Sequence, residues 1–257
     1  QGYELEDVVQ KIRGEKGTEV RLTVRRIDGS IKVIPIIRGK VALEETFAKS
    51  ALIENGKGKI GYIYLSEFYS NFSSADGRRS GEDIAKEVTK LNELGVKGII
   101  LDLRYNGGGS LNDVVDMSGV FVGPGPVVQV KTTESRPMIL RSRTTKIYDG
   151  PFVILVNQGS ASASEILAAA MQDYKRALIV GSNTFGKGTV QKQISIDEVI
   201  DPVVRLKMMN NKEPEIGALK ITIQKFYRVN GGSTQLKGVV PDIVLPDVYS
   251  EIEIGER

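Results

Sequence analysis

The segment Val96-Lys-Gly-Ile-Ile-Leu-Asp-Leu-Arg-Tyr-Asn-Gly-Gly-Gly-Ser-Leu111 carries the clearest signal of the fold class. Its first half, residues 96–103, is a nearly continuous apolar run, which is the pattern of a strand buried on both faces. Three glycines follow, and apolar spacing predicts a helix over 111–121. A buried strand that leads through a short loop into a helix is the repeating unit of a layered α/β core with parallel strand pairs.

The same alternation continues on both sides of this stretch. A helix is predicted over 81–94, where Ile84, Val88 and Leu91 fall on one face. Downstream we expect strands at 127–131 and 152–156, a helix at 163–174, and strands at 177–181, 187–194 and 216–228. The fold class is therefore α/β, with parallel strand pairs in a layered core.

The N-terminal part reads differently from the rest of the chain. Residues 3–14 have helical spacing, and two strands at 19–26 and 31–37 are joined by Asp28-Gly29, a strong hairpin turn. A helix plus a hairpin is too small to bury a core by itself. We therefore expect a separate N-terminal piece over 1–38 and a main domain over 39–257.

Composition narrows the chemistry that this chain can perform. The 257 residues include 35 basic and 32 acidic side chains and no histidine or cysteine. The net charge of +3 is too small to favour nucleic acid as a partner. Disulfides, thiolate or histidine metal sites and histidine-based triads are excluded, because their side chains are missing. The first residues do not read as a signal peptide, and export is left open.

Ser162 lies in Gly159-Ser-Ala-Ser-Ala-Ser-Glu165, between the strand at 152–156 and an alanine-rich helix. A hydroxyl at a helix N-terminus lies beside unpaired backbone N–H groups, and that of Ala163 could receive the oxyanion of an acyl-transfer reaction. The alternative is purely structural, because Ser162-x-x-Glu165 is also a capping box. The local pattern does not decide which of the three alternating serines would act.

Lys187 is the remaining candidate base, in Thr184-Phe-Gly-Lys-Gly-Thr189. A lysine is a base only when neutral, which requires burial to lower its pKa. If 187–194 is a strand, Gln191 points the same way as Lys187 and could hold its amine. The alternatives are a surface lysine in a turn and a phosphate-binding loop. The second is disfavoured, because Gly188 replaces the Ser or Thr of that motif and a strand follows in place of a helix.

The glycine run at 107–109 permits close approach of backbone to a ligand. The N–H of Gly108 could pair with that of Ala163 as a second oxyanion donor. The alternative is an ordinary turn between strand and helix. Asp102 and Arg104, which precede the run, are expected to form a structural ion pair rather than a catalytic one.

Taken together, the stretches 102–109, 160–166 and 184–191 resemble the carboxy-terminal processing peptidases, which are serine proteases with a Ser-Lys dyad. Two later stretches, 224–235 and 237–243, look like the tail-specific protease branch of that family. The resemblance covers nearly the whole chain.

The resemblance implies a role for each site residue. Ser162 is the expected nucleophile, Lys187 the base and Gln191 its support, while the backbones of Ala163 and Gly108 are the expected oxyanion donors. It also implies a layered core with a mixed sheet, related to the crotonase and Clp protease superfamily and preceded by a partial PDZ domain. Residues 3–37 resemble only the last helix and hairpin of that domain, and the carboxylate-binding loop would precede Gln1.

The implied function is an endopeptidase that cleaves unstructured or C-terminally tagged polypeptides in the periplasm or another exported bacterial compartment. Neither a cofactor nor a metal is expected. The expected partners are polypeptides with accessible C-termini, with an adaptor protein and peripheral membrane association left open. Two alternatives remain, namely a catalytically inactive module that binds peptide tails and another acyl-transfer enzyme on a crotonase-like fold.

Overall fold

The computed structural model describes residues 5–39, 46–54, 56, 58–71, 77–133, 135–201, 203–204, 217–249, 252 and 254–256. The chain divides into two compact units, residues 1–45 and 46–257. In the described part of the chain, no helix is both long and apolar enough to cross a bilayer.

The first unit consists of a helix and a hairpin, at the predicted positions: α1 (Leu5–Ile12), β1 (Glu19–Arg25) and β2 (Ile31–Ile37). The strands pair antiparallel, with Leu22 opposite Ile34. Gly29 closes the turn with φ 81°, a left-handed value that favours glycine. All of β2 is exposed, including the large apolar side chains of Ile31 and Ile37.

The second unit is built on a six-stranded sheet in the order β12-β9-β8-β5-β4-β3. Its strands are β3 (Lys49–Glu54), β4 (Lys59–Tyr64), β5 (Gly98–Asp102), β8 (Phe152–Val156), β9 (Leu178–Gly181) and β12 (Ile243–Val244). β3 pairs antiparallel with β4, and all other pairs are parallel. The sheet is therefore mixed with a parallel centre, and the apolar strand β5 lies inside it as predicted.

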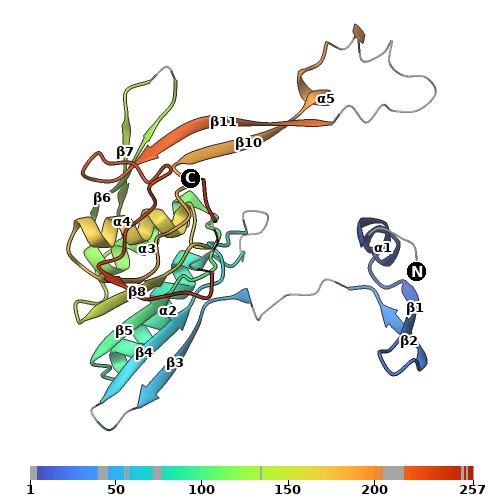
Figure 1. Ribbon diagram of the computed structural model, residues 1–257, viewed down its shortest axis with the longest axis horizontal. Coiled ribbons are helices and arrows are strands. Elements are labelled where there is room, and N and C mark those ends of the chain that lie inside the picture. Colours follow the sequence, from blue (N-terminus) through green and yellow to red (C-terminus); the bar gives the residue numbers. More distant parts are fainter. Residues whose placement is uncertain are drawn as a thin grey trace. The chain divides into compact units, whose positions relative to one another are not determined.

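Three helices pack against this sheet: α2 (Ser80–Glu93), α3 (Leu111–Val122) and α4 (Ala163–Asp173). All three were predicted from the sequence. Figure 1 shows α3 and α4 between the six-stranded sheet and a smaller sheet. The core continues across these layers, with the ring of Phe121 from α3 stacked on that of Phe152 from β8 at 4.0 Å between centroids.

The smaller sheet is antiparallel, in the order β10-β11-β6-β7. Its strands are β10 (Thr189–Ser195), β11 (Ala218–Tyr227), β6 (Gly125–Lys131) and β7 (Met138–Ser142), and the short α5 (Ile196–Val199) follows β10. The expectation that the strand near 127–131 belongs with the parallel strands is wrong, because β6 pairs with β11 and β7. Its buried residues Val127, Val128 and Val130 belong to the common core.

Candidate active site

α4 begins directly after Ser162, whose backbone has an unusual conformation, with φ 55° and ψ −110°. A non-glycine residue with positive φ is uncommon, and such strain costs about 1–3 kcal/mol. The surroundings hold it in place, because the Ser162 N–H donates to Glu165 Oε2 at 2.9 Å. This bond is the Glu165 side of the predicted capping box, which is present in the structure.

The three alternating serines, Ser160, Ser162 and Ser164, differ in burial and in their contacts. Ser160 and Ser164 are fully buried. Their hydroxyls donate to backbone carbonyls, that of Ser160 to Leu103 at 2.8 Å and that of Ser164 to Asn106 at 2.9 Å. Ser162 lines a cavity whose lining includes neither Ser160 nor Ser164. It is therefore the serine available to a substrate.

The cavity at Ser162 has a volume of about 260 Å³ and brings together four of the five predicted site residues, Ser162, Ala163, Lys187 and Gln191. Its complete lining is Gly107, Gly109, Leu111, Ser162, Ala163, Ile166, Lys187, Thr189, Val190, Gln191 and Phe226. The apolar part of this lining comes from four elements, α3, α4, β10 and β11. A polar reactive group beside an apolar wall is the usual composition of a substrate pocket.

Glu165 connects the serine to the lysine. It is fully buried, and its carboxylate accepts four hydrogen bonds. Oε2 receives the backbone N–H groups of Ser162 and Lys187, both at 2.9 Å. Oε1 receives the hydroxyl of Thr184 at 2.6 Å and the N–H of Gly186 at 2.8 Å. One carboxylate oxygen therefore fixes the main chain of both predicted catalytic residues.

Burial raises the pKa of Glu165 above its ordinary 4.5, and the four hydrogen bonds act in the opposite direction. A carboxylate that accepts several N–H groups is favoured in its charged form, whereas removal from water disfavours that form. Here the effect of burial is the larger one.

Lys187 is partly buried and lies just before β10. A strand follows it where a phosphate-binding loop would open a helix, so that alternative does not fit the structure. Gln191, the third residue of β10, is exposed and lines the same cavity. Among the described residues, no hydrogen bond links any two of the Ser162 hydroxyl, the Lys187 amine and the Gln191 amide. The dyad and its support stay predictions.

Gly108 is placed beside the nucleophile, but its N–H has another partner. A Cβ added to Gly108, whose φ is 104°, would lie 2.8 Å from Ser162 Cβ and 3.0 Å from the N of Ala163. The Gly108 N–H donates to Asn106 Oδ1 at 2.9 Å. Gly107 and Gly109 line the cavity. The role of Gly108 as an oxyanion donor also stays a prediction.

The expected ion pair between Asp102 and Arg104 is confirmed. The Asp102 carboxylate is almost completely buried and lies 2.6 Å from Arg104 Nη2. Tyr62 from the neighbouring strand donates its hydroxyl to the same carboxylate at 2.7 Å. Burial, followed by the bond to Asp102, raises the pKa of Tyr62 to about 12. These contacts hold the end of β5, directly before the glycine run.

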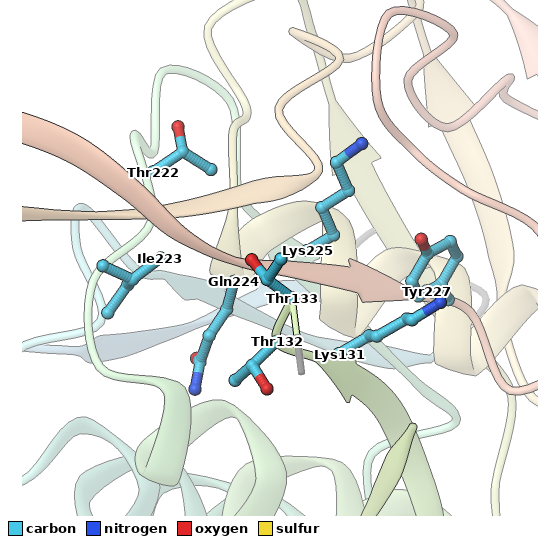
Figure 2. A pocket seen from close by; sticks show the side chains of 8 residues that line it. All are labelled: Lys131, Thr132, Thr133, Thr222, Ile223, Gln224, Lys225 and Tyr227. Atoms are coloured by element: carbon cyan, nitrogen blue, oxygen red, sulfur yellow. The ribbon is translucent and has the colours of Figure 1, made fainter. Parts of the chain in front are cut away.

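No cluster of three metal-ligating side chains occurs among the described residues. A second cavity, of about 400 Å³, lies where β11 leaves β6 (Figure 2). Its lining comes from Lys131, Thr132 and Thr133 and from β11 residues Thr222 to Lys225 and Tyr227. Figure 2 shows Gln224 and Lys225 on opposite sides of β11. None of the predicted catalytic residues lines this cavity.

Sequence reasoning missed several residues that shape the site. Glu165 was recognised only as a helix cap, although its spacing from Ser162 was visible. Asn106 lies within the quoted glycine-run motif, but nothing local showed what its side chain contacts. Gln235, whose Oε1 accepts the Gly188 N–H at 2.7 Å, comes from a distant segment and had no local signal.

Comparison with known proteins agrees with this geometry. The sequence profile described as Peptidase family S41 matches residues 59–245. The tail-specific protease of Haemophilus influenzae is 42% identical over 257 residues, covering 99% of this chain and 34% of that protein. The carboxy-terminal-processing protease of Bartonella bacilliformis is 32% identical over 265 residues, covering 99% of this chain and 55% of that protein. The chain thus spans between a third and just over half of these relatives.

A solved structure shows the same arrangement of elements. The photosystem II D1 C-terminal processing protease aligns with a TM-score of 0.62 and 26% sequence identity, covering 95% of this chain and 60% of that chain. The likeness includes the mixed α/β core on which Ser162 and Lys187 lie.

Proposed function

Because the chain belongs to peptidase family S41, we propose that it is a serine endopeptidase in which Ser162 is the nucleophile and Lys187 the general base. The observation that carries this proposal is that both residues line one cavity and that one carboxylate oxygen, Glu165 Oε2, binds both of their backbone N–H groups. A rigid common support is what a nucleophile and its base need in order to keep a productive geometry.

In the proposed reaction, Ser162 Oγ attacks the carbonyl carbon of the scissile peptide bond while Lys187 Nζ takes its proton. The oxyanion binds to the N–H of Ala163 and to a donor of the glycine run, which we assign to Gly108. Lys187 then gives the proton to the leaving amine, and an ester on Ser162 remains. Water hydrolyses this ester, with Lys187 again as base. Gln191 is proposed to orient the amine.

The proposed substrate is a polypeptide in an extended conformation. β10 is the last strand of its sheet in the described part of the chain, so one of its edges is open. Phe226 N–H donates to Gly188 O at 2.9 Å, which makes the next pair, Thr189 with Lys225, one without hydrogen bonds. The N–H and C=O of Thr189 therefore point away from β11, and Thr189 lines the cavity. An extended substrate can add to this edge.

The wider biology belongs to the same proposal. We assign the substrates to polypeptides with accessible C-termini and the location to an exported bacterial compartment, in keeping with the names and bacterial sources of the relatives. We also assign residues 1–38 to part of a PDZ domain and the core to a crotonase-like fold. The exposed apolar side chains of β2 support the first assignment, because such a face is normally covered within a complete domain.

Substitution of the two predicted catalytic residues tests the function. An unstructured protein with an apolar C-terminus is incubated with the wild type, Ser162→Ala and Lys187→Ala, and its fragments are identified by mass spectrometry. Both variants should lose cleavage by at least about 1,000-fold, because residues of such a unit act together. Lys192→Ala, which removes an exposed lysine from the same strand, is the matched control and should cleave normally.

The same experiment separates the rival functions. A peptide-binding module would bind the substrate in every variant and cleave it in none, including the wild type. Another acyl-transfer enzyme would react with an activated ester but leave the protein intact. Undiminished proteolysis by Ser162→Ala or Lys187→Ala would refute the proposed dyad.

A further inference from the structure

One buried side chain, Asn106, holds the peptide group that joins Gly107 to Gly108. Asn106 has no exposed surface. Its Oδ1 accepts the Gly108 N–H at 2.9 Å, and its Nδ2 donates to the Leu65 carbonyl at 2.9 Å, at the end of β4. A buried amide with both ends bonded is fixed in orientation, because either bond would be lost if the group rotated.

The main chain of Asn106 is bonded to the other half of the site. Its carbonyl accepts the Ala161 N–H at 2.9 Å and the Ser164 hydroxyl at 2.9 Å, and these two residues flank the nucleophile closely in sequence. Asn106 therefore connects the glycine run to the turn that carries Ser162. The contact is tight, because a Cβ at Gly108 would lie 2.8 Å from Ser162 Cβ.

The bond to Asn106 also determines what the Gly108 N–H can do. While the N–H points at Oδ1, it is not directed at the oxyanion of an intermediate attached to Ser162. In a trans peptide the N–H and the preceding C=O point in opposite directions, so rotation of this one peptide group exchanges them. Because this peptide group is flanked by two glycines, the free-energy cost of such a rotation is low. The Gly108 carbonyl is held separately, by the Phe68 N–H at 2.9 Å.

We propose that Asn106 is a positioning residue for the oxyanion site, whose Oδ1 holds the Gly108 N–H beside Ser162 in the free protein and releases it to the oxyanion of the tetrahedral intermediate. The inference rests on the proposed function. In this proposal Asn106 does not touch the substrate. Its effect is to keep the donor paired and beside Ser162 until negative charge develops, when rotation of the Gly107–Gly108 peptide group alone turns the N–H toward the oxyanion.

A comparison of two ligands tests this role. An acetylated tetra-alanine aldehyde forms a tetrahedral adduct with a serine nucleophile and develops an oxyanion, whereas the corresponding acid does not. In Asn106→Leu, which has similar size and no polar atoms, the affinity for the aldehyde should fall by at least about 10-fold, toward the loss seen when an oxyanion donor is removed. The affinity for the acid should stay within about 2-fold, because ground-state contacts are unchanged.

The chain contains a matched control for this substitution. Asn157 is also buried, also follows a strand of the sheet, and its Oδ1 accepts the N–H of Gly159, again two residues on, at 3.0 Å. Neither Asn157 nor Gly159 lines the cavity at Ser162. Asn157→Leu should lower the melting temperature as Asn106→Leu does and leave the ratio of aldehyde to acid affinity unchanged. An equal loss of both affinities in Asn106→Leu would mean a purely structural role and would overturn the inference.

A second measurement does not depend on the folding of any variant. In the wild-type chain, the amide resonance of Gly108 should shift when the aldehyde is added, while that of Gly159 should not. An unchanged Gly108 resonance in a protein that forms the adduct would overturn the role of Asn106 and leave the proposed function standing. A wild type that neither forms the adduct nor cleaves protein would overturn both.

Discussion

At the scale of single residues, Glu165 is the group on which the arrangement of the site depends most. Its two carboxylate oxygens accept the N–H groups of Ser162, Gly186 and Lys187 and the hydroxyl of Thr184. Four donors surround it, so both of its oxygens act as acceptors. A neutral amide cannot replace it, because its NH₂ group would face two of the donors.

Glu165→Gln should therefore lower both proteolysis and stability. Two of the four donors would lose their acceptor, at a cost of about 1–3 kcal/mol each. We expect kcat to fall more than KM rises, because the substrate-binding wall of the cavity is unchanged. Steady-state kinetics and urea denaturation measure the two effects. Glu198→Gln, at an exposed position of α5, is the control and should change neither.

The pH dependence of stability provides an independent readout of the same substitution. Burial raises the pKa of Glu165 in the folded chain above its ordinary 4.5. The folded state then binds this proton more tightly than the unfolded state, so the contribution of Glu165 to stability is greatest at pH values below 4.5 and decreases as the pH rises through the raised pKa. Glu165→Gln should remove this decrease. An unchanged profile would contradict the assignment.

At the scale of secondary structure, β10 connects the base to the substrate. The strand starts two residues after Lys187, so that Thr189, Val190 and Gln191 continue the cavity wall. Its partner β11 contributes Phe226 to the same wall. The open edge of β10 thus presents backbone N–H and C=O groups, and the β10–β11 pair presents apolar side chains, to an extended substrate.

Thr189→Pro tests whether the substrate adds to this edge. Proline removes the N–H that faces away from β11, and an edge strand tolerates proline where no bond to its partner is lost. The loss of one backbone hydrogen bond to the substrate should lower kcat/KM for a peptide by about 2- to 10-fold. Thr189→Ala keeps the N–H and should retain the wild-type value. Equal effects of the two substitutions would argue against addition at β10.

At the scale of the whole second unit, the site depends on two sheets held at a fixed separation by α3 and α4 (Figure 1). Ser162 lies at the start of the helical layer, β10 belongs to the smaller sheet, and the glycine run follows β5 of the larger one. The stacked rings of Phe121 and Phe152 lie in the core that joins these layers. Packing far from the cavity therefore determines its geometry.

Phe121→Ala should destabilise this unit by about 3–5 kcal/mol, because it leaves a cavity in a fully buried layer. Proteolysis should decline with the folded fraction, as measured by circular dichroism during thermal unfolding. Leu94→Ala, where the side chain is 43% exposed, is the control and should unfold close to the wild-type temperature. A similar loss in both variants would contradict the importance of the stacked pair.

Most of the secondary structure and the chemistry available to the chain could be predicted from its amino-acid order. Apolar periodicity is a local property, so α2, α3, α4 and the buried strands β5 and β8 could be predicted from it. The absence of histidine and cysteine left Ser162 and Lys187 as candidates, and the motifs around them indicated the family.

How these parts pack against one another could not be predicted and is seen in the folded chain. Strand pairing depends on contacts between distant segments, which is why β6 was assigned to the wrong sheet and β7 was not predicted. For the same reason, the sequence did not reveal that Ser160 and Ser164 point into the core while Ser162 lines the cavity. The four donors around Glu165 and the bond from Gly108 to Asn106 likewise arise from chain folding, because hydrogen bonds in a buried site are formed by whichever polar groups the packing brings together.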